Sequence, residues 1–297
     1  RDAADSNCVF DSVRGATKVL HSDATSIEAT DTDTLDSFAS DGFQVDADVK
    51  VNTDGENYVA WCWKESATAG FDILIFDGNE TARTISHSLS AVPHLMILKA
   101  RASGSDHWQV FHSAVGQLTS LQLSGAGTPD DSDGYWNDTL PTSSVFSVGD
   151  SSRVNDDGES VVAYLWAPKQ GFSAMGSYKG TGTDTQFVHT GFSPAFILFK
   201  GTSNTSNWLL FDNKKGSVTP GNALYGRDEY LYPNWNYAKV DNSSDGGVDF
   251  LSNGFCLRGT ASMTGSDELN EASAGYIYIA FADAPFVNSN GVPCNAK

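Results

Sequence analysis

Acidic side chains are the most abundant groups in this sequence that could take part in catalysis. A hydrolase acting on glycans needs two carboxyl groups that face each other across a cleft, about 5–10 Å apart. The 37 Asp and Glu residues are scattered through turn segments, and no pair recurs at matching positions along the chain. We interpret them as solvated turn residues. The cluster Asp130-Asp131-Ser132-Asp133-Gly134 could hold Ca²⁺, but it lacks the downstream Glu of the calcium-loop motif, so we favour a plain acidic turn.

Two histidines, His87 and His189, occupy equivalent places before a proline-led apolar segment. A catalytic base is expected once in a chain, whereas a residue that the fold needs recurs with each repeat. We therefore predict that both histidines anchor loops by hydrogen bonding. The sequence has no Gly-x-Ser-x-Gly elbow, phosphate-binding loop or His-Glu-x-x-His motif. It thus predicts no catalytic residue, no metal site and no cofactor, and we expect a protein that is not an enzyme.

Aromatic residues gather in two segments and could bind a ligand, because sugar rings stack on Trp and Tyr faces and aromatic side chains anchor protein contacts. Residues 225–237 combine five aromatics with Asn, Asp and Arg, and they have no clear match elsewhere in the chain. Residues 133–138 form a second, smaller segment. The candidate ligand-binding residues are Arg227, Tyr230, Tyr232, Trp235, Tyr237, Tyr135 and Trp136. The alternative is that these loops cover a sheet edge or a neighbouring subunit, and both interpretations stay open.

The elements that must position these residues are short apolar runs separated by Gly, Ser, Thr, Asn and Asp. Such runs are typical of many short strands joined by turns and indicate an all-β protein. They also repeat. Residues 93–99 followed by Trp108 have a counterpart in residues 194–200 followed by Trp208, with spacings that agree within a residue or two. A third, partial copy begins near residue 10, where the spacing from Phe10 to Gly15 equals that from Phe111 to Gly116.

The repeat predicts three tandem modules and a tail. Residues 1–66 form a partial first module whose N-terminal half is missing, 67–168 a second module, 169–286 a third module, and 287–297 a C-terminal tail. Runs at 58–63, 161–166 and 276–281 are apolar on both faces and are expected to be central strands. Each module of about a hundred residues can close an antiparallel β-sandwich. Because the joints between modules are short, we expect the modules to touch.

Charge and cysteine content narrow the possible partners. The formal net charge of −19 disfavours nucleic acid, whose phosphates it would repel. The apolar runs are shorter than the roughly 20 residues that span a bilayer, so no membrane insertion is expected. The four cysteines are far apart in sequence and are expected to be free thiols, as in a protein assembled in a reducing cytoplasm. Cys62 and Cys256 lie in apolar strand patterns, where they are expected to act as small hydrophobic residues.

Several blocks resemble a domain found in structural and tail proteins of marine bacteriophages, cyanophages among them. The blocks are residues 10–18 (FDSVRGATK), 28–32, 38–43 (FASDGF), 58–64 (YVAWCWK), 249–255 and 276–286. The resemblance covers nearly all of residues 8–297. It implies a concanavalin-like or jelly-roll-like β-sandwich, a place on the virion exterior and a role in tail fibres or related appendages. It supplies no catalytic residue.

These observations together predict a structural and adhesion protein of the phage exterior, assembled in the host cytoplasm, that contacts the host surface through many weak contacts. The expected partners are other virion proteins, further copies of the chain, for instance in a trimer, and a glycan or protein of the host surface. A glycan depolymerase of the tail is one alternative. A purely architectural capsid decoration or filament subunit is another.

Overall fold

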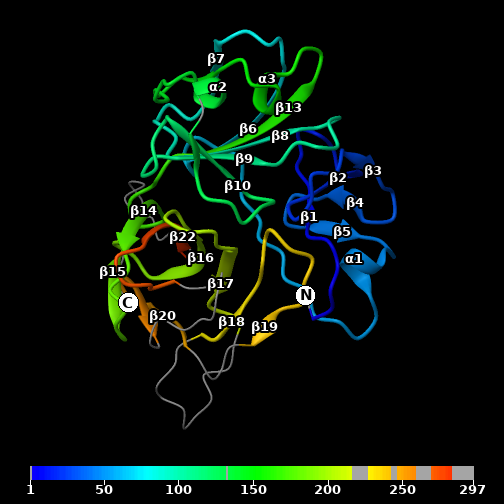
Figure 1. Cartoon of the computed structure of the whole chain (residues 1–297). Coiled ribbons are helices and arrows are strands. Elements are labelled where there is room, and N and C mark those ends of the chain that lie inside the picture. Colours follow the sequence, from blue (N-terminus) through cyan, green and yellow to red (C-terminus); the bar gives the residue numbers. More distant parts are fainter. Residues whose placement is uncertain (1, 132, 216–226, 242–245, 259–268, 283–297) are drawn as a thin grey trace.

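The computed structural model describes residues 2–131, 133–215, 227–241, 246–258 and 269–282. The chain is built from antiparallel β-sheets and forms three lobes around a common centre (Figure 1). The prediction of an all-β protein with tandem β-sandwich modules in close contact is confirmed. The predicted C-terminal tail at 287–297, Cys294 and the first two residues of the 225–237 segment lie outside the described residues. In the described residues, no helix has the length and apolar character needed to cross a bilayer.

The second module contains one large and one small sheet. The large sheet has the strand order β11-β10-β9-β8-β13-β6, and the small sheet pairs β12 with β7. The strands are β6 (Phe71–Asp77), β7 (Arg83–Ser86), β8 (Leu95–Ala100), β9 (Gln109–His112), β10 (Thr119–Gln122), β11 (Asp130–Asp131), β12 (Val145–Val148) and β13 (Ser160–Trp166). Two short helices, α2 (Asp133–Trp136) and α3 (Ser152–Asn155), flank β12.

The third module repeats this arrangement. Its large sheet has the order β14-β22-β16-β17, which corresponds to β6-β13-β8-β9, and its small sheet has the order β15-β21-β20. The strands are β14 (Ser173–Lys179), β15 (Gln186–His189), β16 (Pro194–Gly201), β17 (Trp208–Asp212), β18 (Glu229–Tyr230), β19 (Val240–Asp241), β20 (Gly247–Leu251), β21 (Gly254–Arg258) and β22 (Gly275–Ala282). The repeat seen in the sequence is therefore also a repeat of topology.

The first module corresponds to the later part of the second. Its elements are β1 (Cys8–Val9), β2 (Lys18–His21), β3 (Ala29–Thr30), β4 (Leu35–Phe38), β5 (Phe43–Val45) and α1 (Val49–Asn52). Strands β1, β2 and β3 pair in the same order as β9, β10 and β11. The helix α1 matches α3, because each starts after a polar N-cap, Asp48 or Ser151, whose side chain accepts a backbone N–H two residues on.

One predicted strand is wrong. Residues 58–63, expected to be a central strand, belong to no strand, although their counterpart β13 pairs with both β6 and β8. The physical reason is that residues 1–66 contain no counterpart of β6 or β8, so this segment has no neighbour with which to form a ladder. Its side chains still alternate: Val59, Trp61 and Trp63 are partly buried, whereas Tyr58 and Cys62 are exposed.

The exposure of Cys62 also contradicts the expectation that it packs as a small hydrophobic residue. Cys256 meets that expectation, because it is buried in β21. Both thiols and that of Cys8 are free.

The strands that are apolar on both faces separate two different cores. On β13, Val162, Tyr164 and Trp166 face one cluster, whereas Val161, Ala163 and Leu165 face another. Strand β22 behaves in the same way, with Ile277, Ile279 and Phe281 on the first of these clusters. We call this first cluster the central core, because it collects residues from all three modules, including Leu20, Val110 and Leu210. The large sheets thus pack against one another, and each small sheet covers an outer core of its own module.

Candidate functional site

Two tryptophans at equivalent positions join each module to the one before it. The indole Nε1 of Trp108 donates a hydrogen bond of 2.9 Å to the carbonyl oxygen of His21 in the first module. The indole Nε1 of Trp208 donates a hydrogen bond of 2.8 Å to the carbonyl oxygen of Gln122 in the second module. Both rings are buried in the central core. Each tryptophan therefore combines a large buried surface with a directional contact across a module boundary.

The first module makes the matching contact with the third. Asn7 occupies the position of Trp108, and its Nδ2 donates to the carbonyl oxygen of Tyr232 at 2.9 Å and to that of Trp235 at 3.1 Å. Tyr232 in turn corresponds to His21 and Gln122, because each follows a leucine paired with an apolar residue of the neighbouring strand. These pairs are Leu20 with Val9, Leu121 with Val110, and Leu231 with Leu210.

The three contacts form a cycle. The second module binds the first, the third binds the second, and the first binds the third, so the chain closes into a ring of three modules with approximate three-fold symmetry (Figure 1). Trp63 lies at its centre, with its ring 6.1 Å from that of Trp166 and 5.5 Å from that of Phe281. Trp166 and Phe281 lie at matching positions, since Trp166 pairs with Leu95 of β8 and Phe281 with Phe196 of β16.

Two buried lysines strengthen the same boundaries. The ammonium group of Lys99 donates to the carbonyl oxygens of Thr25, Ala100 and Ser103, of which Thr25 belongs to the first module. Lys200, its counterpart, donates to the carbonyl oxygen of Ala126 in the second module at 3.2 Å and to that of Ser206 at 2.8 Å. Burial lowers the pKa of each lysine to about 8, so both remain largely protonated at neutral pH.

An ionic network closes the boundary between the first and second modules. Arg14, whose side chain is fully buried, contacts Asp11 at 2.5 Å through Nε and Glu28 at 3.2 Å through Nη1. Glu28 also accepts from Arg101 of the second module at 2.8 Å, and its pKa is lowered because these hydrogen bonds outweigh its burial. The hydroxyl of Tyr164 donates to Asp11 at 2.6 Å. Each carboxylate in this network is therefore paired.

Four of the predicted ligand-binding aromatics are buried. Tyr230 and Tyr232 pack in the outer core of the third module, and Tyr135 and Trp136 in that of the second. Trp136 also donates its indole N–H to the carbonyl oxygen of Thr119. The expectation that these rings are exposed is wrong, and we do not propose them as ligand contacts.

Trp235 and Tyr237 have the exposure that ligand binding requires. Their side chains are 40% and 51% exposed, and their ring centroids lie 4.8 Å apart with a tilt of 40°. The backbone before them is fixed by the first module, because Asn7 binds the carbonyl oxygens of Tyr232 and Trp235. Arg227, the remaining candidate, is half-buried and donates to the carbonyl oxygen of Lys215. We call Trp235 and Tyr237 the aromatic pair.

The two repeated histidines lie at module surfaces. The imidazole Nε2 of His87 lies 3.1 Å from the carbonyl oxygen of Thr142, and its Nδ1 accepts the backbone N–H of Leu89. His87 therefore anchors a loop as predicted. The ring of His189 packs against that of Phe187 at 6.4 Å. In the acidic turn, Asp130 accepts a hydrogen bond from the hydroxyl of Tyr135 at 2.9 Å and contacts Arg153 at 3.5 Å.

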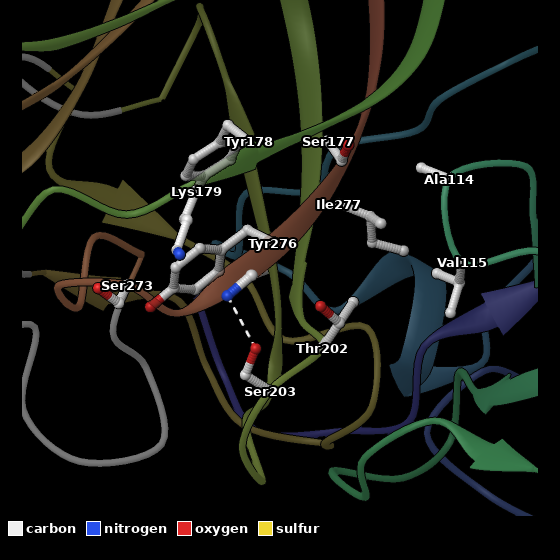
Figure 2. A pocket seen from close by; sticks show the side chains of 11 residues that line it. Ala114, Val115, Ser177, Tyr178, Lys179, Thr202, Ser203, Ser273, Tyr276 and Ile277 are labelled. Atoms are coloured by element: carbon white, nitrogen blue, oxygen red, sulfur yellow. Dashed lines mark hydrogen bonds between the residues drawn. The ribbon is translucent and has the colours of Figure 1, made fainter.

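A groove of about 460 Å³ lies between the second and third modules (Figure 2). Ala114 and Val115 line one side, and the start of β22 with Tyr276 lines the other. Tyr276 stacks on Tyr178 with ring centroids 5.1 Å apart. Hydroxyl groups and one ammonium group surround the opening: Ser177, Thr202, Ser203, Ser273 and Lys179. This lining can form hydrogen bonds with a polar or anionic small molecule.

Comparison with family models decides the classification of the chain. A model described as a domain of unknown function (DUF7483) matches residues 1–285. The chain belongs to this family. Comparisons with curated proteins and with solved structures find no match.

This DUF7483 chain is expected to lose stability in acid through His112, a buried residue at the boundary between the second and third modules. Its Nδ1 accepts the N–H of Ala114, and its Nε2 lies 3.4 Å from the carbonyl oxygen of Tyr278. Burial lowers the pKa of His112 to about 4, whereas an unfolded histidine titrates near 6.5. The unfolded state therefore takes up the proton first. Stability should fall by about 3 kcal/mol as the pH drops from roughly 6.5 to 4.

The variant His112→Asn tests this prediction, because an amide can donate to Tyr278 and accept from Ala114 without titrating. Urea unfolding should be measured at several pH values for both proteins. The difference between their pH profiles isolates the histidine from the carboxylates that titrate in the same range. Parallel profiles between pH 6.5 and 4 would show that His112 does not carry the effect.

The ring contacts themselves escaped prediction from sequence. Eleven positions separate Val110 from Leu121, whereas twenty-one separate Leu210 from Leu231. This longer connection concealed that residues 230–234 match the region after β9, so the segment seemed to lack a counterpart. The matching signal was present in the leucine before Gln122 and the leucine before Tyr232. The roles of Asn7 and Lys99 had no sequence signal beyond the recurrence of Trp108 and Lys99 at Trp208 and Lys200.

Proposed function

We propose that this chain is a structural and adhesion unit on the exterior of a bacteriophage particle, in a tail fibre or a comparable appendage. The observation that carries the proposal is the cyclic set of contacts made by Asn7, Trp108 and Trp208. It fixes three similar modules in one rigid body, which suits a part that transmits force and presents repeated surfaces. The resemblance to phage tail domains supports the same assignment. Host-surface glycans and neighbouring virion proteins are the proposed partners.

The aromatic pair is the proposed contact with the host surface. Exposed Trp and Tyr rings offer flat apolar faces on which sugar rings stack, and such residues dominate the binding energy of many interfaces. Trp235 and Tyr237 lie where the third module meets the first, so the ring of modules holds their backbone in place. Several copies of the chain on one particle would convert weak single contacts into strong attachment.

Replacing both Trp235 and Tyr237 by alanine is expected to weaken binding to host cells by at least about tenfold, because two exposed aromatic contacts of ordinary strength are lost. The measurement is the binding of fluorescently labelled protein to host bacteria and to their purified surface polysaccharide. The matched control is Phe187→Ala, which removes another exposed aromatic of the third module. Equal binding of the double variant and the wild type would refute the role of the aromatic pair.

The location in the particle needs a separate test. Antibodies raised against this chain should label the tail or its appendages on intact phage particles in electron micrographs. Labelling of the capsid alone would favour a decoration protein instead. Release of soluble sugar from host polysaccharide by the purified chain would favour a depolymerase.

A further inference from the structure

The outer face of the first module is an uncovered half of a hydrophobic core. Phe43 is 43% exposed and Tyr58 is 37% exposed. Their counterparts in the second module are Phe146 and Val161, which are 1% and 0% exposed. The correspondence is fixed by α1 and α3 and by the positive-φ glycines that follow these helices, Gly55 at 79° and Gly158 at 76°. The first module therefore presents to solvent the positions that the second module buries.

The cover of these positions in the second module is known. Phe146 pairs with Ile85 of β7, and β13 lies between β6 and β8. Met96 and Leu98 of β8, with Leu74 and Phe76 of β6, complete the outer core. These three strands come from one continuous stretch, residues 71–100, and the third module has the same stretch in β14, β15 and β16. The first 66 residues contain no such stretch.

The backbone of the first module leaves places for the same three strands. In the described residues, β1 pairs with β2 alone, whereas its counterpart β9 pairs with both β10 and β8. Strand β5 pairs with β4 alone, whereas its counterpart β21 pairs with both β20 and β15. Residues 58–63 have no ladder at all. Unpaired strand edges beside an exposed apolar face are the usual setting for strand addition.

We propose that the outer face of the first module binds a partner polypeptide that carries a three-stranded block built like residues 71–100 of this chain. The incoming strand of the β8 type would lie between β1 and residues 58–63, and would bury Tyr58, Ala60 and Cys62. In the β8-type strands of this chain, a terminal lysine reaches a carbonyl oxygen of the preceding module, at Thr25 or Ala126. The equivalent position for the first module is Asn236 of the third. A lysine at the end of the incoming strand is therefore part of the recognition. The inference does not depend on the proposed adhesion function.

Cys62 reports on this binding directly, because it is exposed and its counterpart Leu165 is fully buried. The probe is residues 69–102 of this chain fused to a soluble carrier protein. Addition of the probe to the full chain should slow alkylation of Cys62 by about tenfold when the probe is ten times above its dissociation constant, as measured by peptide mass spectrometry. A control probe with Leu98→Asp, which places a charge in the covered face, should give no protection.

A variant of the full chain separates specific binding from adhesion to the carrier. Ala60→Asp changes an exposed residue whose counterpart Ala163 is fully buried, so it should leave the fold intact and abolish protection. Ala272→Asp, an exposed alanine of the third module, should have no effect. Absence of protection in the wild type would overturn the proposal. Protection that grows with the concentration of the chain alone would assign the face to a second copy and would also overturn it.

Discussion

Replacing Trp208 by alanine should destabilise the protein by about 3–5 kcal/mol, the usual cost of removing a buried tryptophan. The ring fills the central core, and its indole N–H is the hydrogen bond donor for the carbonyl oxygen of Gln122 in the neighbouring module. The variant therefore creates a cavity and leaves a buried acceptor without its partner. The measurement is the free energy of unfolding from urea titration followed by circular dichroism.

Two further variants divide this effect into its parts. Trp208→Phe keeps most of the apolar volume and removes the N–H, and should cost about 1–3 kcal/mol. Trp235→Ala removes a tryptophan of the same module that is largely exposed, and should change stability by about 0.5 kcal/mol or less. A Trp208→Ala variant as stable as Trp235→Ala would mean that the modules are not joined through this side chain.

Replacing Arg14 by alanine should cost about 3–5 kcal/mol, because one partner of a buried ionic network is removed. The change leaves Asp11 and Glu28 without the guanidinium that now contacts both carboxylates, and Asp11 is buried. Arg14 also donates to the carbonyl oxygens of Val9 and Lys18, so two backbone acceptors lose their donor. The free energy of unfolding should be measured at pH 7, where both carboxylates are ionised.

The matched control is Lys50→Ala, which removes a partly exposed ion pair with Asp48 in the same module. Such pairs contribute about 1 kcal/mol or less, because water and salt screen them. Similar losses for Arg14→Ala and Lys50→Ala would contradict the view that the boundary between the first two modules is buried. Lower pH should narrow the difference, since the lowered pKa of Glu28 means that the contribution of this carboxylate is lost as it becomes protonated in acid.

The sequence carries the fold well where a pattern repeats with its neighbours intact. The runs at 161–166 and 276–281 were expected to be central strands, and they form β13 and β22. The same pattern at 58–63 failed, because strand formation depends on partner strands that the first module lacks. Apolar character on both faces indicates burial on both sides, but it does not say that one of the two faces belongs to a core shared by three modules.

The candidate site was harder to predict, because exposure is a property of the whole fold. Tyr230, Tyr232 and Tyr237 are close in sequence and chemically alike, yet the first two are buried and the third is exposed. Burial follows from the pairing of Leu231 with Leu210, which a long connection conceals in the sequence. Asn7 resembles Trp108 neither in size nor in polarity, so its equivalent role is visible only from its place beside β1.

The closing contact between the first and third modules is the central claim and is best tested by cross-linking. Cysteines introduced at Asn7 and Trp235, in a chain whose Cys8 and Cys62 are changed to serine, should lie close together, because the Asn7 side chain binds the Trp235 carbonyl oxygen. A short thiol cross-linker should join them within one chain, whereas cysteines at Asn7 and Phe187, on the outer sheet of the third module, should not be joined. Efficient linkage of the first pair supports a closed ring of modules. Failure of the first pair to link within the chain, while both cysteines react with a monofunctional reagent, would show that the ring is open.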